Sequence, residues 1–106
     1  LSNEKKVKFI KIKDNNLLCY PILNILTPKR KKLINFLSKK KIPTNIYYPL
    51  PLNEQKVFRD INKKKTTLFN CKKLSKTILS LPFHLSLKES QIKYITNNIK
   101  NFYKNN

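Results

Sequence analysis

The chain contains no glycine, and this absence restricts every tight turn and helix end that it can form. Glycine takes positive φ angles without steric cost, and helices commonly end on it. The apolar periodicity predicts a helix with the Thr27 hydroxyl as its N-cap and Pro28 at its first position, ending in the run Lys39-Lys40-Lys41. A glycine would ordinarily stand there, so either Lys41 takes the left-handed conformation itself or the helix ends in another way.

The apolar pattern along the rest of the chain predicts one small mixed domain. Extended segments are expected over residues 7–12, 17–26, 42–48 and 79–82, with proline in the second marking a bulge or an edge strand. Further helices are expected over residues 53–60 and 67–78, and from an N-cap at Ser86, paired with Glu89 in a capping box, to about Tyr103. This order predicts an α+β fold, a short sheet with helices packed on one face.

The two later helices carry regular apolar stripes, which predict the faces that they bury. The stripe of the final helix consists of Ile92, Ile95, Ile99 and Phe102. The stripe of the helix before it consists of Leu68, Cys71, Leu74 and Ile78. Both stripes are expected to face a core.

The two cysteines, Cys19 and Cys71, have no metal-ligand spacing, so each is expected to pack as a small apolar residue in a reducing compartment. No secretory signal and no apolar run of membrane-spanning length is present. We therefore expect a cytoplasmic protein with no membrane partner. Since the sequence starts with leucine rather than methionine, we also expect a piece of a longer protein.

The charge is strongly basic, with 24 Lys+Arg against 5 Asp+Glu and a formal net charge of +19. Selection for a polyanion is one explanation, because clustered lysines release counterions from phosphate backbones. Coding drift in an AT-rich genome is the other, and we favour it: glycine and alanine are missing, and Arg30 and Arg59 are the only arginines. Nucleic acid is thus not the expected partner, although a small polyanion-binding module and a decayed gene remnant stay open as alternatives.

The stretch IPTNIYYPLPLNEQ, residues 42–55, carries the most specific signal. Tyr47 and Tyr48 stand directly before a Pro-Leu-Pro-Leu run that cannot continue a helix or a central strand. Two aromatic hydroxyls therefore reach the lip of a rigid, extended turn. From the residues alone, one tyrosine would be core and the other surface, because side chains alternate along a strand.

Three blocks in order resemble the DegT/DnrJ/StrS family of sugar aminotransferases, which use pyridoxal phosphate (PLP). Arg30 and Leu33 supply the family's R-x-x-L helix. KIPTNIYYPLPLNEQ then matches the family's GIPT-x-x-HYP-x-PL turn, and LSLPFH, residues 79–84, matches LSLPMH before the last helix. The amino-acid sequence of the turn most resembles that of family members that act on UDP-linked 3-keto-glucuronate sugars.

The resemblance implies the small C-terminal domain of a fold-type I aminotransferase, spanning residues 1–106. In such enzymes the large N-terminal domain holds the Schiff-base lysine, the aspartate facing the pyridine nitrogen and the phosphate-binding residues. None of those motifs is present here, so we expect no catalytic and no cofactor-binding residue, and no PLP bound by this chain alone. His84, the lone histidine, is expected to be structural rather than a metal ligand.

The same resemblance implies that the small domain forms one wall of the sugar-nucleotide site in an enzyme that makes sugars for cell-surface polysaccharides. The expected substrate-binding residues are Tyr47 and Tyr48; Tyr48 matches the family, whereas Tyr47 replaces its histidine. The implied partners are the large domain, a nucleotide-sugar substrate and a second subunit of a homodimer. We expect this chain to be inactive alone.

Overall fold

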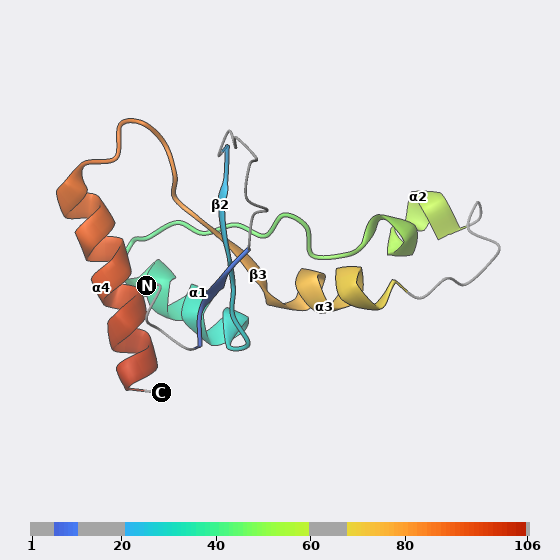
Figure 1. Cartoon of the computed structure of the whole chain (residues 1–106), viewed down its shortest axis with the longest axis horizontal. Helices are drawn as coiled ribbons and strands as arrows, with labels where there is room; N and C mark the ends of the chain where they lie inside the picture. Colours follow the sequence, from blue (N-terminus) through green and yellow to red (C-terminus); the bar gives the residue numbers. More distant parts are fainter. Residues whose placement is uncertain (1–5, 11–20, 60–67, 106) are drawn as a thin grey trace.

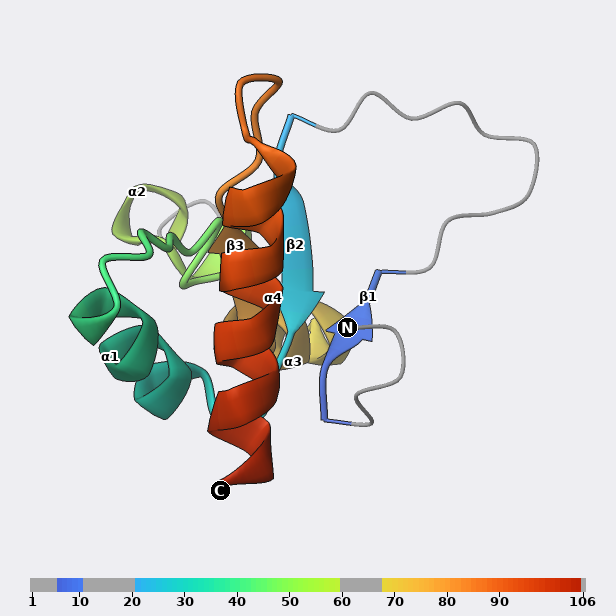
Figure 2. The same ribbon diagram turned by 90° about the vertical axis from the view of Figure 1, so that its left-hand side faces the viewer.

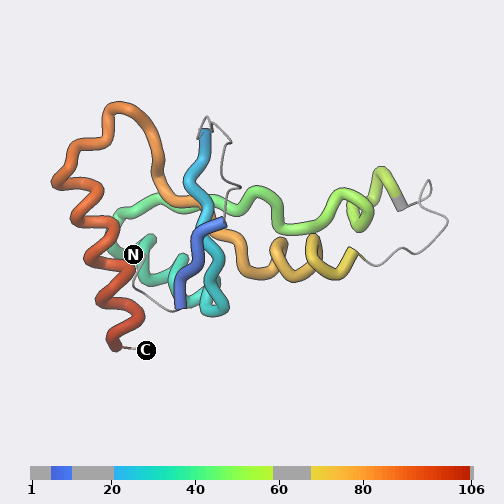
Figure 3. Tube along the Cα trace, viewed as in Figure 1, coloured from blue at the N-terminus to red at the C-terminus, as the bar shows by residue number. Residues whose placement is uncertain are grey.

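The computed structural model describes residues 6–10, 21–59 and 68–105 (Figure 1). An antiparallel three-stranded sheet has the order β1 (Lys8–Phe9), β2 (Leu23–Leu26), β3 (Ile78–Leu81). Its helices are α1 (Arg30–Lys39), α2 (Lys56–Arg59), α3 (Phe69–Thr77) and α4 (Glu89–Lys104), with the short 3₁₀ turn η1 (Leu52–Glu54) before α2. The tube in Figure 3 follows this path from the first strand to the last helix. The predicted α+β class is confirmed.

The register of β2 against β3 places one apolar pair and one polar pair on opposite faces of the sheet. Ile25 lies opposite Leu79, and both side chains are fully buried. Asn24 lies opposite Ser80 on the other face, since side chains alternate, and the Ser80 hydroxyl donates to Asn24 Oδ1 at 2.6 Å. Figure 2 shows α4 in front of β2 and β3 and α3 behind them. The core draws on the sheet, α1 and α4: Val7, Ile25, Leu33, Leu37, Ile42, Leu79, Leu81, Ile99, Phe102 and Tyr103.

The end of α1 takes the first of the two expected routes. Lys41 has a φ of 57°, the left-handed conformation that glycine would ordinarily supply. The Lys41 N–H bonds to the Ser38 carbonyl at 2.9 Å, and the Ile42 N–H bonds to the Leu37 carbonyl at 3.0 Å. These two bonds form a Schellman motif, with Ile42 and Leu37 together in the core.

The beginning of α1 differs from the prediction. Lys29, not Thr27, is the N-cap residue, and no side chain caps the helix. Thr27 is fully buried, and its hydroxyl is hydrogen-bonded to the hydroxyl of Tyr103. Its N–H donates to the Thr77 carbonyl at 2.9 Å. A partner 76 residues away has therefore taken the hydroxyl that was expected to cap the helix.

The beginning of α4 also differs from the prediction. The helix starts at Glu89 with Lys88 as its N-cap, so the expected box of Ser86 and Glu89 is wrong. Gln91 supplies the contact instead: its Oε1 accepts from the Lys88 N–H at 2.9 Å. Half of a capping box is therefore present, shifted by two residues along the chain, because the Lys88 ammonium cannot accept the second bond.

The extended segment predicted over residues 42–48 is wrong. Asn45 alone pairs with β3, through an isolated bridge in which its N–H and carbonyl bond to Ser80 at 3.1 and 2.8 Å. Pro43 has no N–H to donate, so a ladder cannot extend from this bridge toward Pro43. The helix predicted over residues 53–60 is divided at Gln55 into η1 and α2. The segment predicted over residues 17–26 lies partly outside the described residues. Its described part contains β2, which is a central strand of the sheet and not an edge strand.

Residues 50–58 and α3 form an arm that extends away from the core (Figure 1). The stripe predicted to be buried on α3 is exposed at Leu68, Cys71 and Leu74, so the expectation that Cys71 packs inside is wrong; Cys19 lies outside the described residues. The Arg30 guanidinium anchors the arm by donating to the carbonyls of Ser75 and Ile78. Within the part of the chain that the structure describes, no helix has the length and apolar character needed to cross a bilayer.

Candidate functional site

Both tyrosines of the proline-rich turn lie at the surface. Tyr47 is 38% exposed and Tyr48 is 69% exposed, so neither belongs to the core. Their ring centroids are 5.7 Å apart with an interplanar angle of 70°, an edge-to-face contact. The peptide bond between them is cis. The pair therefore presents two phenols to whatever approaches this turn.

Tyr47 lines an open cavity of about 300 Å³ between the turn and the end of β3. The turn contributes Pro43, Thr44 and Asn45, and the β3 side contributes Ser80, Pro82 and Phe83. Prolines and aromatic rings make its walls apolar, while a few hydroxyl and amide groups supply polarity. This combination is typical of sites that bind small organic ligands. Tyr48 is not among the lining residues.

Asn45 connects the cavity wall to the sheet, and sequence reasoning missed it. Its backbone pairs with Ser80 in both directions. Its side-chain Nδ2 bonds to the Tyr47 hydroxyl at 2.6 Å, and its Oδ1 accepts from the Ile46 N–H at 2.8 Å. Asparagine side chains commonly bond to nearby backbone in this way. This tendency of asparagine, at a position two residues before Tyr47, is the sequence feature that could have indicated a role for Asn45.

A second, smaller cavity of about 150 Å³ lies between the chain after β3 and α4. It is lined mainly by aliphatic and aromatic side chains, including Leu81, Phe83 and Ile92, with His84 beside them. The described residues contain no group of three or more histidine, cysteine, aspartate or glutamate side chains that could hold a metal ion.

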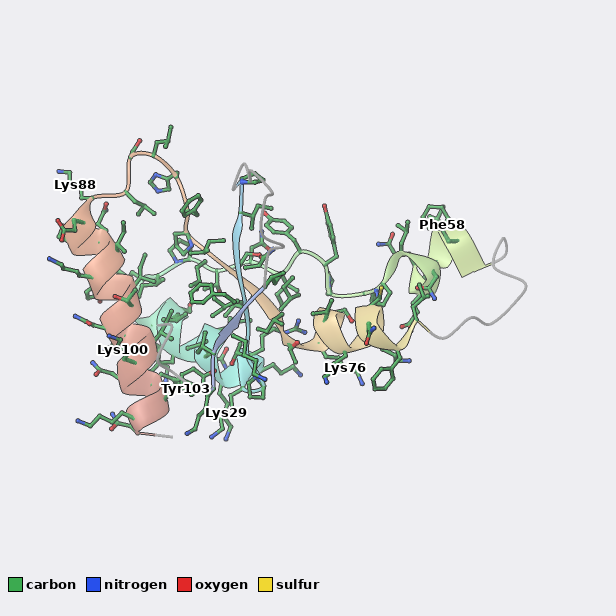
Figure 4. All side chains as sticks on the ribbon, viewed as in Figure 1. Lys29, Phe58, Lys76, Lys88, Lys100 and Tyr103 are labelled. Atoms are coloured by element: carbon green, nitrogen blue, oxygen red, sulfur yellow. The ribbon has the colours of Figure 1, made fainter. Side chains whose placement is uncertain are left out.

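The residues that the structure describes do not fit a PLP site. Neither cavity is lined by a lysine or by an acidic side chain, whereas this cofactor needs an amine for its aldehyde and a carboxylate for its pyridine nitrogen. The lysines of the described residues are exposed, apart from the half-buried Lys29. Figure 4 shows Lys76 on α3, Lys88 at the N-cap of α4 and Lys100 on α4, well apart from one another.

The lysines are also dispersed rather than gathered into one surface. Those labelled in Figure 4 come from the N-caps of α1 and α4, from α3 and from the second half of α4. Two ion pairs join described residues: Lys72 with Glu54 at 3.3 Å and Lys93 with Glu89 at 2.7 Å. Exposed pairs of this kind contribute little stability. No single element carries the positive charge.

Comparison with known proteins covers nearly the whole chain. The model of the DegT/DnrJ/EryC1/StrS aminotransferase family matches residues 1–100. A protein of Geobacillus stearothermophilus named pleiotropic regulatory protein is 42% identical over 80 residues, which are 76% of this chain and 22% of that protein.

Two solved structures share the fold. The X-ray structure of S. venezuelae DesV in complex with a ketimine intermediate has a TM-score of 0.88 at 16% identity, covering 95% of this chain and 27% of that one. A DegT DnrJ EryC1 StrS aminotransferase from Brucella abortus has a TM-score of 0.83 at 29% identity, covering 92% of this chain and 26% of that one. The chain thus spans about a quarter of the length of the relatives it matches, and by the extent of the family match it belongs to the DegT/DnrJ/EryC1/StrS aminotransferase family.

Proposed function

We propose that this chain is the small C-terminal domain of a PLP-dependent aminotransferase that acts on a nucleotide sugar in the cytoplasm. In this proposal Tyr47 and Tyr48 form one wall of the sugar-nucleotide site, and residues outside this chain hold the cofactor. PLP, when bound there, supplies the electron sink for transamination. The domain itself orients the substrate and excludes water from one side of the site.

The observation that carries the proposal is the mismatch of lengths. More than nine tenths of this chain superimposes on aminotransferases, yet it accounts for about a quarter of each of them. This mismatch supports a cofactor site in the part of the enzyme that this chain does not span.

The exposed side of the arm supports a missing partner. Leu52, Val57 and Phe69 are 64%, 76% and 71% exposed on adjoining parts of it. The helix α3 is amphipathic, yet its apolar stripe stays 44% exposed at Leu68 and 42% exposed at Leu74. Exposed apolar patches mark surfaces that bind another protein or another domain. We assign the arm to contact with the large domain or with the second subunit.

The polyanion-binding alternative gains no support from the described surface. A dedicated site would gather its basic side chains on one face, whereas the lysines here are dispersed over the helices. We therefore retain the aminotransferase domain as the proposed function.

A domain exchange tests the proposal. The region of the Brucella abortus aminotransferase that matches this chain is replaced by residues 1–106, and transamination of a UDP-linked keto sugar is followed by chromatography. We expect the chimera to turn over, and the isolated chain to show neither turnover nor a saturable, site-specific PLP adduct. A folded chimera that binds PLP but has no detectable turnover would contradict the proposal and favour a decayed remnant.

A further inference from the structure

The orientation of the Asn45 amide follows from what its neighbours can donate. One end of the amide faces the Ile46 N–H at 2.8 Å, and a backbone N–H can only donate. The atom facing it must therefore be the oxygen. The NH₂ group then faces the Tyr47 hydroxyl at 2.6 Å, and an amide nitrogen can only donate. One backbone N–H, that of Ile46, thus decides the direction of the side-chain bond.

The direction of that bond decides what the Tyr47 hydroxyl can offer. A phenol donates one hydrogen and accepts through its oxygen. Since the oxygen already accepts from Asn45, the hydroxyl hydrogen is left to donate elsewhere. Among the residues that the structure describes, none accepts it, and the ring lines the open cavity of about 300 Å³. Tyr47 is held as a hydrogen-bond donor at the cavity.

We infer that Asn45 is a positioning residue that presets Tyr47 to donate to an anionic oxygen, phosphoryl or carboxylate, of a ligand in this cavity. The inference rests on the proposed function, in which a nucleotide sugar occupies the site. A donor selects an acceptor, and hydrogen bonds to charged acceptors are the stronger ones. The formal charge of +19 favours a negatively charged ligand over a neutral one.

Replacing Asn45 by aspartate tests the direction of the hydrogen bond between residue 45 and the Tyr47 hydroxyl. One carboxylate oxygen can still accept from the Ile46 N–H, but the other can only accept from Tyr47. The phenolic hydrogen would then be consumed inside the protein, and the ligand would lose its donor. The backbone bonds between Asn45 and Ser80 do not involve the side chain, so the fold is preserved. Asn35→Asp, on the exposed surface of α1, is the charge-matched control.

The experiment uses the 106-residue chain and measures the affinities of pyrophosphate, UDP, UDP-glucose, UDP-glucuronate and uridine by NMR titration at physiological salt. We expect Tyr47→Phe and Asn45→Asp each to weaken anion binding about tenfold, the order expected for one hydrogen bond to a charged group. In the Tyr47→Phe background, Asn45→Asp should cost much less, since no phenolic hydrogen remains to be lost. Asn35→Asp should leave every affinity near that of the wild type.

The ligands separate the two sources of the anionic oxygen. A loss shared by pyrophosphate and UDP would assign the donor to the diphosphate, and a loss confined to UDP-glucuronate would assign it to the sugar carboxylate. Unchanged affinities in Tyr47→Phe, or additive losses in the double variant, would overturn the inference. So would a wild-type chain that binds none of the anions, while the turnover of the chimera would still stand. Conversely, an inactive chimera with anion binding intact would refute only the proposed aminotransferase.

Discussion

Lys41 gives the sharpest test of the backbone argument, because its φ of 57° is a conformation that costs an ordinary residue energy. An L-residue pays about 1–2 kcal/mol in the left-handed region. Lys41→Gly removes that cost, but it raises the conformational entropy of the unfolded chain, which lowers the free energy of unfolding by about 0.4–1 kcal/mol. The net expectation is a gain of about 0.8 kcal/mol in the free energy of unfolding. Both Schellman hydrogen bonds are kept, because they use only backbone atoms.

The neighbouring Lys40 is the matched control. Its φ is −91°, so Lys40→Gly relieves no strain, removes the same charge and should lose about 0.7 kcal/mol. The two variants should therefore differ by about 1.5 kcal/mol, or about 6–12 °C in melting temperature for a domain of this size. Urea unfolding followed by circular dichroism measures both, and Lys41→Ala separates the effect of charge from that of φ. Equal stabilities of the two glycine variants would refute the reasoning.

Arg30→Met should lower the free energy of unfolding by about 2 kcal/mol, because the carbonyls of Ser75 and Ile78 lose a charged donor. Hydrogen exchange of the α3 amides should become faster in this variant, and it should not change in the exposed control Lys31→Met. Thr27→Val and Tyr103→Phe should each cost about 1–2 kcal/mol, and together less than their sum, because the buried bond that they share is lost only once. Additive costs in a double-mutant cycle would exclude that coupling. The affinity for RNA should fall steeply with added salt, and it should fall equally when the lysines of α1 or those of α3 are neutralised. If the lysines of one helix alone accounted for the affinity, and binding showed a sequence preference, a selected binding surface would be indicated instead.

The fold was predictable where local pattern and long-range packing agree. The predicted stripe of α4 is buried at Ile99 and Phe102 and partly buried at Ile95, but Ile92, at the start of the helix, is 47% exposed. Lys41 took the left-handed conformation, the first of the two alternatives that the absence of glycine left open. Thr27 was mispredicted because a hydroxyl that suits an N-cap equally suits a buried partner 76 residues away. Local sequence contains no information about which partner wins.

The α3 stripe shows a different limit. The amphipathic spacing of Leu68 and Leu74 predicts a helix face suited to burial, but it does not predict whether residues of the same chain bury that face. In the candidate site, motif and composition pointed to Tyr47 and Tyr48. They could not supply Asn45, because its role depends on which amide end meets the Ile46 N–H, and only geometry decides that.

The bond between Thr27 and Tyr103 also sets when the domain can fold during synthesis. β2 emerges early, but its partner β3 follows more than fifty residues later, and α4 later still. At about 5–20 residues per second, the 76 residues that separate Thr27 from Tyr103 take about 4–15 s to make. Until β3 is made, Ile25 has no opposing Leu79, and one edge of β2 stays unpaired. The nascent chain is thus most exposed to chaperones and to strand-mediated aggregation before its last helix is translated.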